Sequence, residues 1–175
     1  MIIGNKKLLI FPEYHLTDFP PQVKMSSDEA RTMLMMYSKY GFDILIAGYV
    51  EIAEENLYSS CLIIDESNTF NIRKRYPYND ENKIIIAWHG KNSPVELSIG
   101  KSYFLLCNDL NKELDRGMDL IQNIENFFLI SAMFNNFEEN IKSGIAYCKQ
   151  YNVKRFIYAD RFNGIKQQEI YSSVK

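Results

Sequence analysis

The hydrophobic positions in the first fifty residues fall into two short unbroken runs. Residues 8–11 (LLIF) are followed by Pro12 and Glu13, and the second run lies within residues 43–49 (DILIAGY). Apolar runs of this length, bounded by turn residues, predict buried strands. The first strand would deliver Glu13 to its carboxyl end, which is where open α/β sheets place their ligands.

A helical period separates these two predicted strands. Apolar side chains recur at three- and four-residue intervals over residues 27–40, Ser26 and Glu29 have the spacing of a capping box, and Gly41 follows. A capping box marks the start of a helix, and glycine is common just past a helix end. The sequence therefore predicts a strand, a helix and a second strand parallel to the first.

The middle of the chain changes to strand-like segments without a helical period. These segments are residues 57–65, 70–75, 83–88 and 95–107, separated by turn residues. The connection at residues 65–68 (DESN) is typical of a hairpin. We therefore expect consecutive strands here to pair antiparallel.

The last third of the chain mixes helical and strand-like patterns. Helical patterns cover residues 110–116 and 137–151, and the strand-like segments are residues 121–124, 127–134 and 155–160, the first of them the weakest. From Asn163 the sequence is polar, and we expect a mobile tail. The sum is an α/β fold in one domain, residues 1–175.

Composition and charge narrow the class of protein. The 175 residues are 46% hydrophobic, enough for one core, and a formal net charge of -2 gives no general attraction to nucleic acid or acidic membranes. The three cysteines form no Cys-x-x-Cys pair, so neither a disulfide framework nor a zinc ribbon is indicated, and a cytoplasmic, reducing location fits best. The N-terminal residues lack the order of a signal peptide, and no apolar run approaches the roughly 18 residues that span a bilayer.

One of the three cysteines, Cys107, stands at a predicted turn from a strand to a helix. Such a turn offers free backbone N–H groups and the positive end of a helix, which favour a thiolate and can bind an oxyanion. The alternative is that Cys107 is a small buried hydrophobic residue. Cys61, inside a strand, and Cys148, on the apolar face of a helix, fit that alternative well.

Lys74 is a candidate for a buried cation. Side chains alternate along residues 70–75, so Lys74 would share the apolar face of the strand while its two arginine neighbours point the other way. A lysine on an apolar face needs a partner, and Glu13 or Glu81 could supply the carboxylate. The alternative is an edge strand with three solvated cations.

The sequence offers little support for a metal site, a Cys-His dyad or a phosphate-binding loop. The only two histidines, His15 and His89, stand in different contexts without a ligand cluster, so neither a metal site nor a Cys-His dyad is supported. Glycine-rich phosphate loops are absent, and no cofactor is expected. Glu13 therefore remains as the base for a thiol.

Three stretches, taken together and in this order, resemble the carbon-nitrogen hydrolase, or nitrilase, superfamily. LIFPE, ending in Glu13, resembles the family's glutamate motif, and NIRKR, containing Lys74, resembles its lysine motif, which often continues to a second glutamate, here Glu81. LLCND, containing Cys107, resembles the cysteine motif. The resemblance runs over nearly the whole chain.

The resemblance implies a minimal α-β-β-α sandwich of the nitrilase type and a thiol amidohydrolase mechanism. Glu13 would take the thiol proton, and Cys107 would attack an amide carbon, or in second place a nitrile carbon, to give a thioester that water then hydrolyses. Lys74 and the backbone N–H of Asn108 would stabilise the oxyanion. Glu81 would position Lys74 or the substrate.

Several neighbouring residues receive supporting roles in this interpretation. Tyr58 and Phe134 are candidates to line a substrate pocket, with core packing as the commoner role for such aromatic residues. Asp109 is expected to be a structural anion that pairs with a nearby cation. Ser59 departs from the asparagine of the family's Tyr-Asn-Ser segment.

The chain also departs from the family at both ends. Only residues 1–7 precede the glutamate strand, and the family's later Gly-x-Ser motif and further strands do not follow before Lys175. Missing outer strands would expose sheet edges, so we expect a shortened member that covers them as a homodimer or higher homo-oligomer, or with a partner. Two alternatives stay open, namely a catalytically inactive relative that binds a small molecule or a protein, and an α/β domain in which the motifs are accidental.

Overall fold

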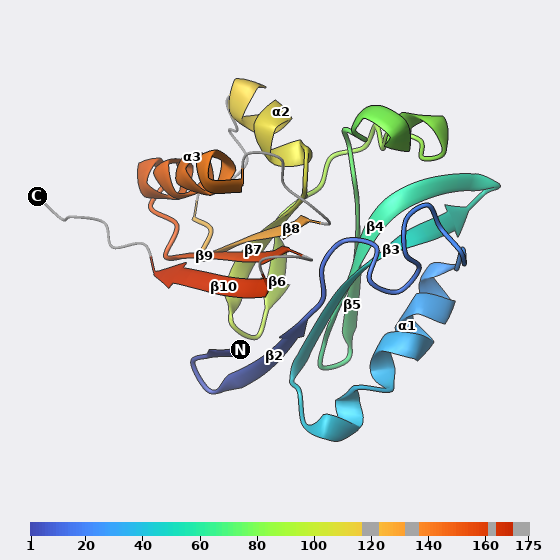
Figure 1. Ribbon diagram of the computed structural model, residues 1–175. Helices are drawn as coiled ribbons and strands as arrows, with labels where there is room; N and C mark the ends of the chain where they lie inside the picture. Colours follow the sequence, from blue (N-terminus) through green and yellow to red (C-terminus); the bar gives the residue numbers. More distant parts are fainter. Residues whose placement is uncertain (117–122, 132–136, 161–163, 170–175) are drawn as a thin grey trace, which may run out of the picture.

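The structure is a computed structural model that describes residues 1–116, 123–131, 137–160 and 164–169. In it, the first half of the chain forms one five-stranded sheet (Figure 1). Its strands, in the order in which they lie, are β1 (Ile2–Ile3), β2 (Lys6–Ile10), β3 (Ile44–Ala53), β4 (Asn56–Asp65) and β5 (Asn68–Arg73). β2 and β3 are parallel, as predicted, and the other neighbours are antiparallel.

The second half of the chain forms the other five-stranded sheet. In order of position its strands are β10 (Gly164–Glu169), β9 (Arg155–Asp160), β8 (Asn126–Ser131), β7 (Gly100–Leu106) and β6 (Val95–Leu97). β7, β8 and β9 run parallel, so their carboxyl ends meet at one edge, while β6 and β10 pair antiparallel on the outside.

Helices cover the outer faces of the two sheets (Figure 1). α1 (Ser27–Met35) packs on the first sheet, and α2 (Asp109–Arg116) and α3 (Phe137–Gln150) lie over the second. The arrangement is therefore the four-layer α-β-β-α sandwich predicted from the sequence. No helix in the described ranges is long and apolar enough to cross a membrane.

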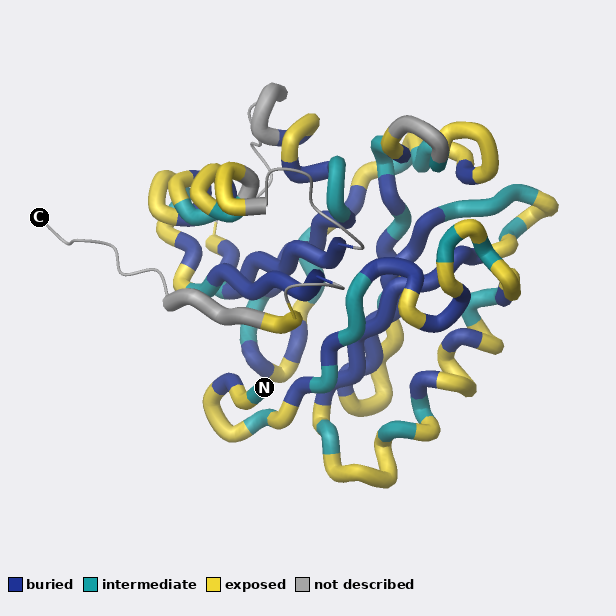
Figure 2. Tube along the Cα trace, in the orientation of Figure 1, coloured by how far each residue is buried: buried dark blue, intermediate teal, exposed yellow. Residues whose placement is uncertain are grey.

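The apolar runs of the sequence are unbroken because the inner strands are buried on both faces. In β3, Ile44 and Ile46 point into the cluster between the two sheets, whereas Leu45 and Ala47 point to the cluster under α1. A strand covered on both sides reads as a continuous apolar run instead of an alternation. Figure 2 shows the result, with buried residues concentrated in the central strands and exposed residues on helices and loops.

The predicted helix over residues 27–40 is divided in two. Its start is as expected, because the Ser26 hydroxyl accepts a hydrogen bond from the Glu29 N–H and the Glu29 carboxylate accepts one from the Ser26 N–H. α1 ends at Met35, and a 3-10 turn, η1 (Ser38–Tyr40), leads to Gly41, whose φ of 75° reverses the chain.

Three predictions about strands are corrected by the structure. Residues 83–88 form no strand, because the polar run before them makes a 3-10 turn, η2 (Asn79–Lys83), and an irregular segment follows. Residues 95–107 are not one strand but the hairpin of β6 and β7, which turns before Gly100. Residues 164–169 are not a mobile tail, since they form β10 along β9. Residues 121, 122, 132–134 and 170–175 lie outside the described ranges.

Candidate active site

The loop that carries Glu13 is bound to both sheets. After β2, the Phe11 N–H donates to the Ile46 carbonyl at 2.8 Å in the first sheet, and the Glu13 N–H donates to the Ser131 carbonyl at 3.3 Å in the second. The loop also presses against Gly48, where a Cβ atom would lie 2.5 Å from the Glu13 Cα. Glycine at this point allows the close approach of the two backbones, and the backbone position of Glu13 is thereby fixed.

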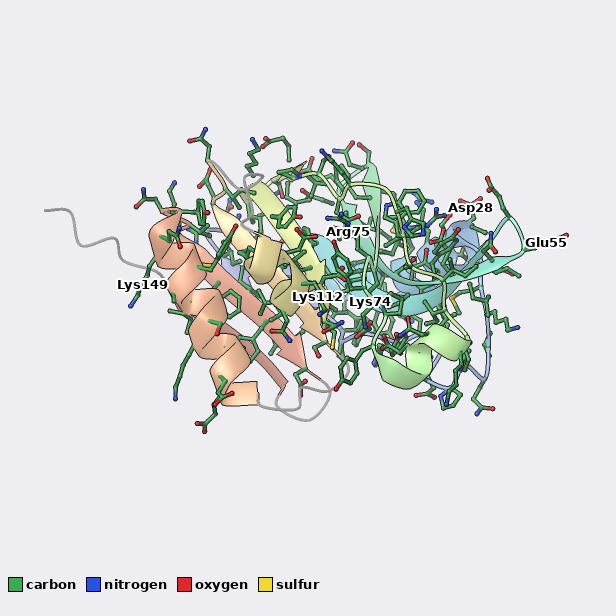
Figure 3. The ribbon with its side chains drawn as sticks, turned by 90° about the horizontal axis from the view of Figure 1, so that it is seen from above. Asp28, Glu55, Lys74, Arg75, Lys112 and Lys149 are labelled. Carbon is green, nitrogen blue, oxygen red and sulfur yellow. The ribbon has the colours of Figure 1, made fainter. Side chains whose placement is uncertain are left out.

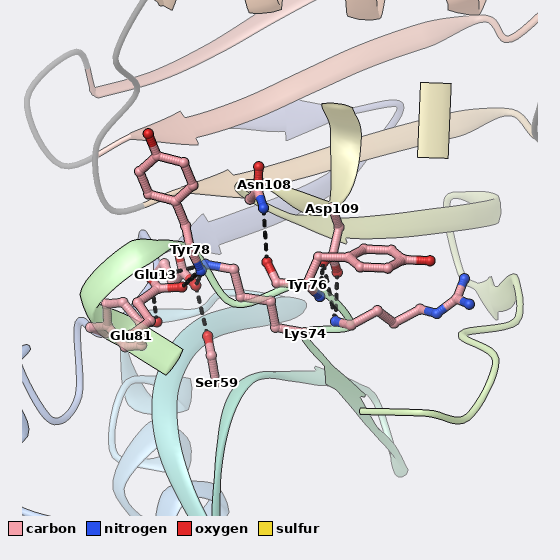
Figure 4. Close-up of polar contacts among 10 residues, drawn as sticks. Glu13, Ser59, Lys74, Tyr76, Tyr78, Glu81, Asn108 and Asp109 are labelled. Carbon is pink, nitrogen blue, oxygen red and sulfur yellow. Dashed lines mark hydrogen bonds and ion pairs between the residues drawn. The ribbon is translucent and has the colours of Figure 1, made fainter. Parts of the chain in front are cut away.

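Lys74 lies between two carboxylates at the centre of the candidate site (Figure 4). Its Nζ donates to Glu13 Oε1 at 2.9 Å and to Glu81 Oε2 at 2.8 Å, and the side chains of Lys74 and Glu13 are fully buried. The prediction that Lys74 faces inward to a glutamate partner is confirmed, and the alternative of a solvated lysine is wrong. Seen from above, Lys74 lies centrally, whereas Asp28, Glu55 and Lys149 lie at the periphery (Figure 3).

The two carboxylates keep Lys74 charged despite its burial. Desolvation lowers the pKa of the lysine, but the charges of Glu13 and Glu81 and the hydrogen bond to Glu81 raise it, and the pKa lies above its usual value. Lys74 therefore presents a permanent ammonium inside the protein at any physiological pH.

Two hydroxyl groups that the sequence reasoning did not assign complete this network. Ser59 Oγ donates to Glu13 Oε1 at 2.7 Å, and Tyr14 Oη donates to Glu81 Oε1 at 2.8 Å. Tyr14 follows Glu13 directly and has a φ of 62°, which turns its side chain back toward Glu81. The available signals were the unusual serine at position 59 and a tyrosine next to the glutamate.

Cys107 occupies the turn between β7 and α2. Its N–H donates to the Ile130 carbonyl at 2.9 Å, and its φ of 44° is the left-handed conformation that few non-glycine residues adopt. The charges of Lys74, Glu13 and Glu81 all act on its thiol. The residues of the three sequence motifs are thus coupled electrostatically.

The expectation that this turn favours a thiolate is wrong. Burial raises the pKa of the Cys107 thiol, and although the Lys74 ammonium lowers it, Glu13 raises it again, to about 12. Cys107 is therefore a neutral thiol at pH 7. A neutral thiol attacks effectively only when a base removes its proton.

Asp109 holds the loop after Lys74 against the loop after Cys107 (Figure 4). Its carboxylate accepts hydrogen bonds from the backbone N–H groups of Arg75, at 3.1 Å, and Tyr76, at 2.8 Å. The predicted pairing of Asp109 with a cation is therefore replaced by backbone contacts. Burial is the main reason that its pKa rises to about 7. Asn108 adds a bond from its Nδ2 to the Tyr76 carbonyl at 3.1 Å.

The structure does not bring Tyr58 to this network. Side chains alternate along β4, and because Ser59 faces Glu13, Tyr58 faces the opposite side. There its ring lies 4.4 Å from the Arg73 guanidinium and contacts Trp88 edge-on. Phe134, the other aromatic candidate for the substrate pocket, lies outside the described residues.

A cavity of about 310 Å³ lies beside the loop that carries Glu13. It is lined by residues 12–15 and Asp18, whereas Lys74 and Cys107 do not line it. The ring of His15 stacks on Phe11 with centroids 3.9 Å apart, which gives this histidine a packing role. The network itself combines buried carboxylates, an ammonium and a neutral thiol.

Comparison with solved structures identifies the fold. A cysteine-to-serine variant of an amidase from Nesterenkonia AN1, described as a member of the nitrilase superfamily, superposes with a TM-score of 0.65 at 19% identity, covering 88% of this chain and 63% of that one. A carbon-nitrogen hydrolase from Helicobacter pylori G27 gives 0.60 at 16% identity, over 88% of this chain and 61% of that one. A CN-hydrolase superfamily protein from Xanthomonas campestris gives 0.70 at 11% identity, over 95% and 69%.

These comparisons confirm the resemblance to the carbon-nitrogen hydrolase, or nitrilase, superfamily at the level of the fold. The sequence matches no family model and no curated protein. The chain spans less than two thirds of the length of the Nesterenkonia and Helicobacter proteins. The class that fold and site define is thus a nitrilase-type α-β-β-α sandwich.

Proposed function

We propose that this protein is a hydrolase that acts on a non-peptide carbon-nitrogen bond, with a small amide as the preferred substrate and a nitrile in second place. Glu13, Lys74 and Cys107 are the proposed catalytic residues. The observation that supports this most is the buried contact of Lys74 with Glu13 and Glu81. The charges of these three side chains act on the Cys107 thiol, and the fold is shared with amidases.

The first half of the proposed reaction forms a thioester. As Cys107 Sγ attacks the amide carbon, Glu13 takes the thiol proton, which a thiol with a pKa of about 12 does not release by itself at neutral pH. The carbonyl oxygen becomes an oxyanion, stabilised by the Lys74 ammonium and the backbone N–H of Asn108. The carbon-nitrogen bond then breaks, and the proton held by Glu13 passes to the departing amine.

The second half releases the acid. Glu13 takes a proton from water, whose oxygen attacks the thioester carbon, and the tetrahedral intermediate collapses with Cys107 as the leaving group. The proton returns from Glu13 to the sulfur, so the enzyme is restored and the net reaction is amide plus water to acid plus amine. Removing one oxyanion donor typically costs about 10²- to 10³-fold in rate.

Glu81 is the proposed positioning residue for Lys74. It binds the ammonium together with Glu13 and is itself held by the Tyr14 hydroxyl. These two carboxylate contacts fix the position of the Lys74 ammonium.

Ammonia release from a panel of small primary amides tests the proposal. We expect turnover by the wild-type protein, none by Cys107→Ala or Glu13→Gln, and normal turnover by the control Cys148→Ala, because Cys148 lies on the buried face of α3, in the cluster against the second sheet. Turnover that persists in Cys107→Ala would contradict the assigned nucleophile. Equal labelling of Cys107, Cys61 and Cys148 by iodoacetamide, read by intact mass, would contradict an activated Cys107.

A catalytically inactive binding protein is the alternative, and the same panel separates the two. It predicts no turnover of any amide, and labelling of Cys107 that Glu13→Gln leaves unchanged. Self-association as a homo-oligomer and a cytoplasmic location stay predictions from the sequence.

A further inference from the structure

An open cavity of about 510 Å³ runs along the outer edge of β5, on the side away from β4. Residues 69–73 of β5 line one side of it, and Trp88 with residues 91–95 lines the other. We call this cavity the edge groove. β5 is the last strand of the first sheet, so the groove lies where a further strand of that sheet would lie (Figure 1).

The outward backbone groups of β5 are available in this groove. Arg73 is paired with Ser60, and the next N–H, that of Lys74, donates to the Ser59 carbonyl at 2.8 Å. In an antiparallel ladder this makes Arg73 a non-hydrogen-bonded position, so the N–H and C=O groups of residues 69, 71 and 73 point away from β4. Within the described ranges, the Arg73 carbonyl accepts from Asn92 Nδ2 at 2.8 Å, and the N–H and C=O groups of Thr69 and Asn71 have no partner.

Such an edge is one that proteins ordinarily protect. Prolines, lysines, bulges or very short strands discourage another chain from pairing there. β5 has six residues, NTFNIR, and contains neither proline nor lysine. The edge is therefore competent to accept one more strand.

The two faces of β5 define which side chains a new strand would carry. Phe70 and Ile72 belong to the core between the sheets, whereas Asn71 and Arg73 lie on the other face, where Arg73 forms a bidentate ion pair with Glu51 at 2.8 Å. A strand added beside β5 would continue both faces, with apolar side chains next to Phe70 and Ile72 and polar ones next to Asn71 and Arg73.

The charge of the groove favours acidic partners. No aspartate or glutamate lines it, and its two cations are Arg73 and Lys91. Glu51 neutralises Arg73, but Lys91 is exposed and forms no ion pair with any described residue. A carboxylate on the incoming strand would therefore meet an unbalanced positive charge.

We propose that the edge groove binds an extended segment of a partner protein, in which apolar side chains alternate with acidic and polar ones, as an additional strand on β5. The alternating backbone groups supply the hydrogen bonds of this β-augmentation, and the two faces and Lys91 supply its specificity. This binding is independent of the proposed hydrolysis, because Glu13 and Lys74 do not line the groove.

The single tryptophan of the protein, Trp88, lines the groove and reports on its occupancy. The probe is a capped seven-residue peptide that alternates valine with glutamate or threonine and contains no tryptophan. We expect a saturable change in Trp88 fluorescence with this peptide. We expect none with a peptide of the same composition in which the valines are contiguous, nor with one methylated at the amide nitrogens that would face β5.

A proline at position 71 separates strand addition from other kinds of binding. Asn71→Pro removes an outward N–H that the β4–β5 ladder does not use, a position that edge strands tolerate. Asn71→Ala is the matched control, since it loses the same side chain and its bond from the Tyr49 hydroxyl but keeps the N–H. We expect at least tenfold weaker peptide binding in Asn71→Pro than in Asn71→Ala. Lys91→Glu, at an exposed site, should weaken binding of the acidic peptide and permit binding of a lysine-containing analogue.

Three results would overturn the proposal. The first is equal binding of the alternating and contiguous peptides, and the second is equal binding by Asn71→Pro and Asn71→Ala. The third is a wild-type dimer in analytical ultracentrifugation that Asn71→Pro dissociates, which would mean that the groove holds a second copy of this chain. Because peptide binding is measured without any amide substrate, failure here leaves the proposed hydrolysis untouched.

Discussion

Replacing Lys74 by methionine tests whether the buried ion network governs the stability of the fold. Methionine has a similar length and fills the space, but it leaves the carboxylates of Glu13 and Glu81 without their shared cation. At an effective dielectric constant of 20, each contact, at 2.9 and 2.8 Å, is worth about 6 kcal/mol of Coulomb energy. The cost of desolvating the buried ions opposes much of this energy.

The net effect of the substitution is a loss of about 3–5 kcal/mol in the free energy of unfolding, the usual consequence of removing one partner of a buried pair. This loss is large against the roughly 5–15 kcal/mol that stabilises a typical domain.

Urea denaturation at pH 7.5, followed by circular dichroism and Trp88 fluorescence, measures this loss. Lys112→Met on α2 is the matched control, because Lys112 is exposed and its loss should change stability by less than about 0.5 kcal/mol. A difference below about 1 kcal/mol for Lys74→Met would refute the network as described.

Other substitutions test single contacts of the site. Gly48→Ala places a methyl group 2.5 Å from the Glu13 Cα, so we expect the free energy of unfolding, measured with urea, to fall by about 1–3 kcal/mol and the proposed amidase activity to be lost. Gly4→Ala, whose methyl group would meet no atom within 4 Å, should keep that activity. Ser59→Ala removes a hydrogen bond to the buried Glu13 carboxylate and should cost about 1.5–3 kcal/mol by the same method. Asp109→Asn keeps one oxygen for the Arg75 and Tyr76 N–H groups but replaces the other, which also accepts from the Arg75 N–H, by an NH₂ donor, and this should cost about 1–3 kcal/mol. Burial raises the pKa of Asp109 to about 7, so protonated Asp109 stabilises the fold fully below pH 4, and this stabilisation is lost as the pH rises through 7. Asp109→Asn should lack this change in stability between pH 4 and 8. A variant whose stability depends on pH as the wild-type protein's does would contradict the prediction.

Local signals in the sequence predicted most of the elements. The Ser26 and Glu29 capping box, the apolar runs of β2 and β3 and the hairpin of β4 and β5 each depend on residues close together in the chain, and each is present. β10 was missed because its residues are polar and its stability comes from pairing with β9. The segment 83–88 was misread because its apolar residues neither pair in a sheet nor pack together in the core: Ile85 is buried, whereas Ile84 and Ile86 are exposed.

Within the candidate site, the sequence predicted only the residues that belong to the three motifs. Lys74 was predicted to be buried beside Glu13 or Glu81 from the cost of placing a cation on an apolar face, and the structure pairs it with both. Ser59 and Tyr14 were missed because their partners lie 46 and 67 residues away in sequence, a separation over which side-chain contacts leave no local pattern. The high pKa of Cys107 depends likewise on burial that only the folded structure defines.

Each sheet is made by one uninterrupted half of the chain, and the candidate residues are divided between the halves. Glu13, Lys74 and Glu81 belong to the first half, and Cys107 belongs to the second. A chain cut between η2 and β6 would yield two fragments, each with all the strands of one sheet, and neither with both the base and the thiol. Amidase activity would therefore be a reporter of fragment reassembly, appearing only on mixing. In the intact chain, the proposed nucleophile comes near its proposed base only after the two sheets have docked, so under the proposed function a nascent or partly unfolded chain would carry no reactive centre.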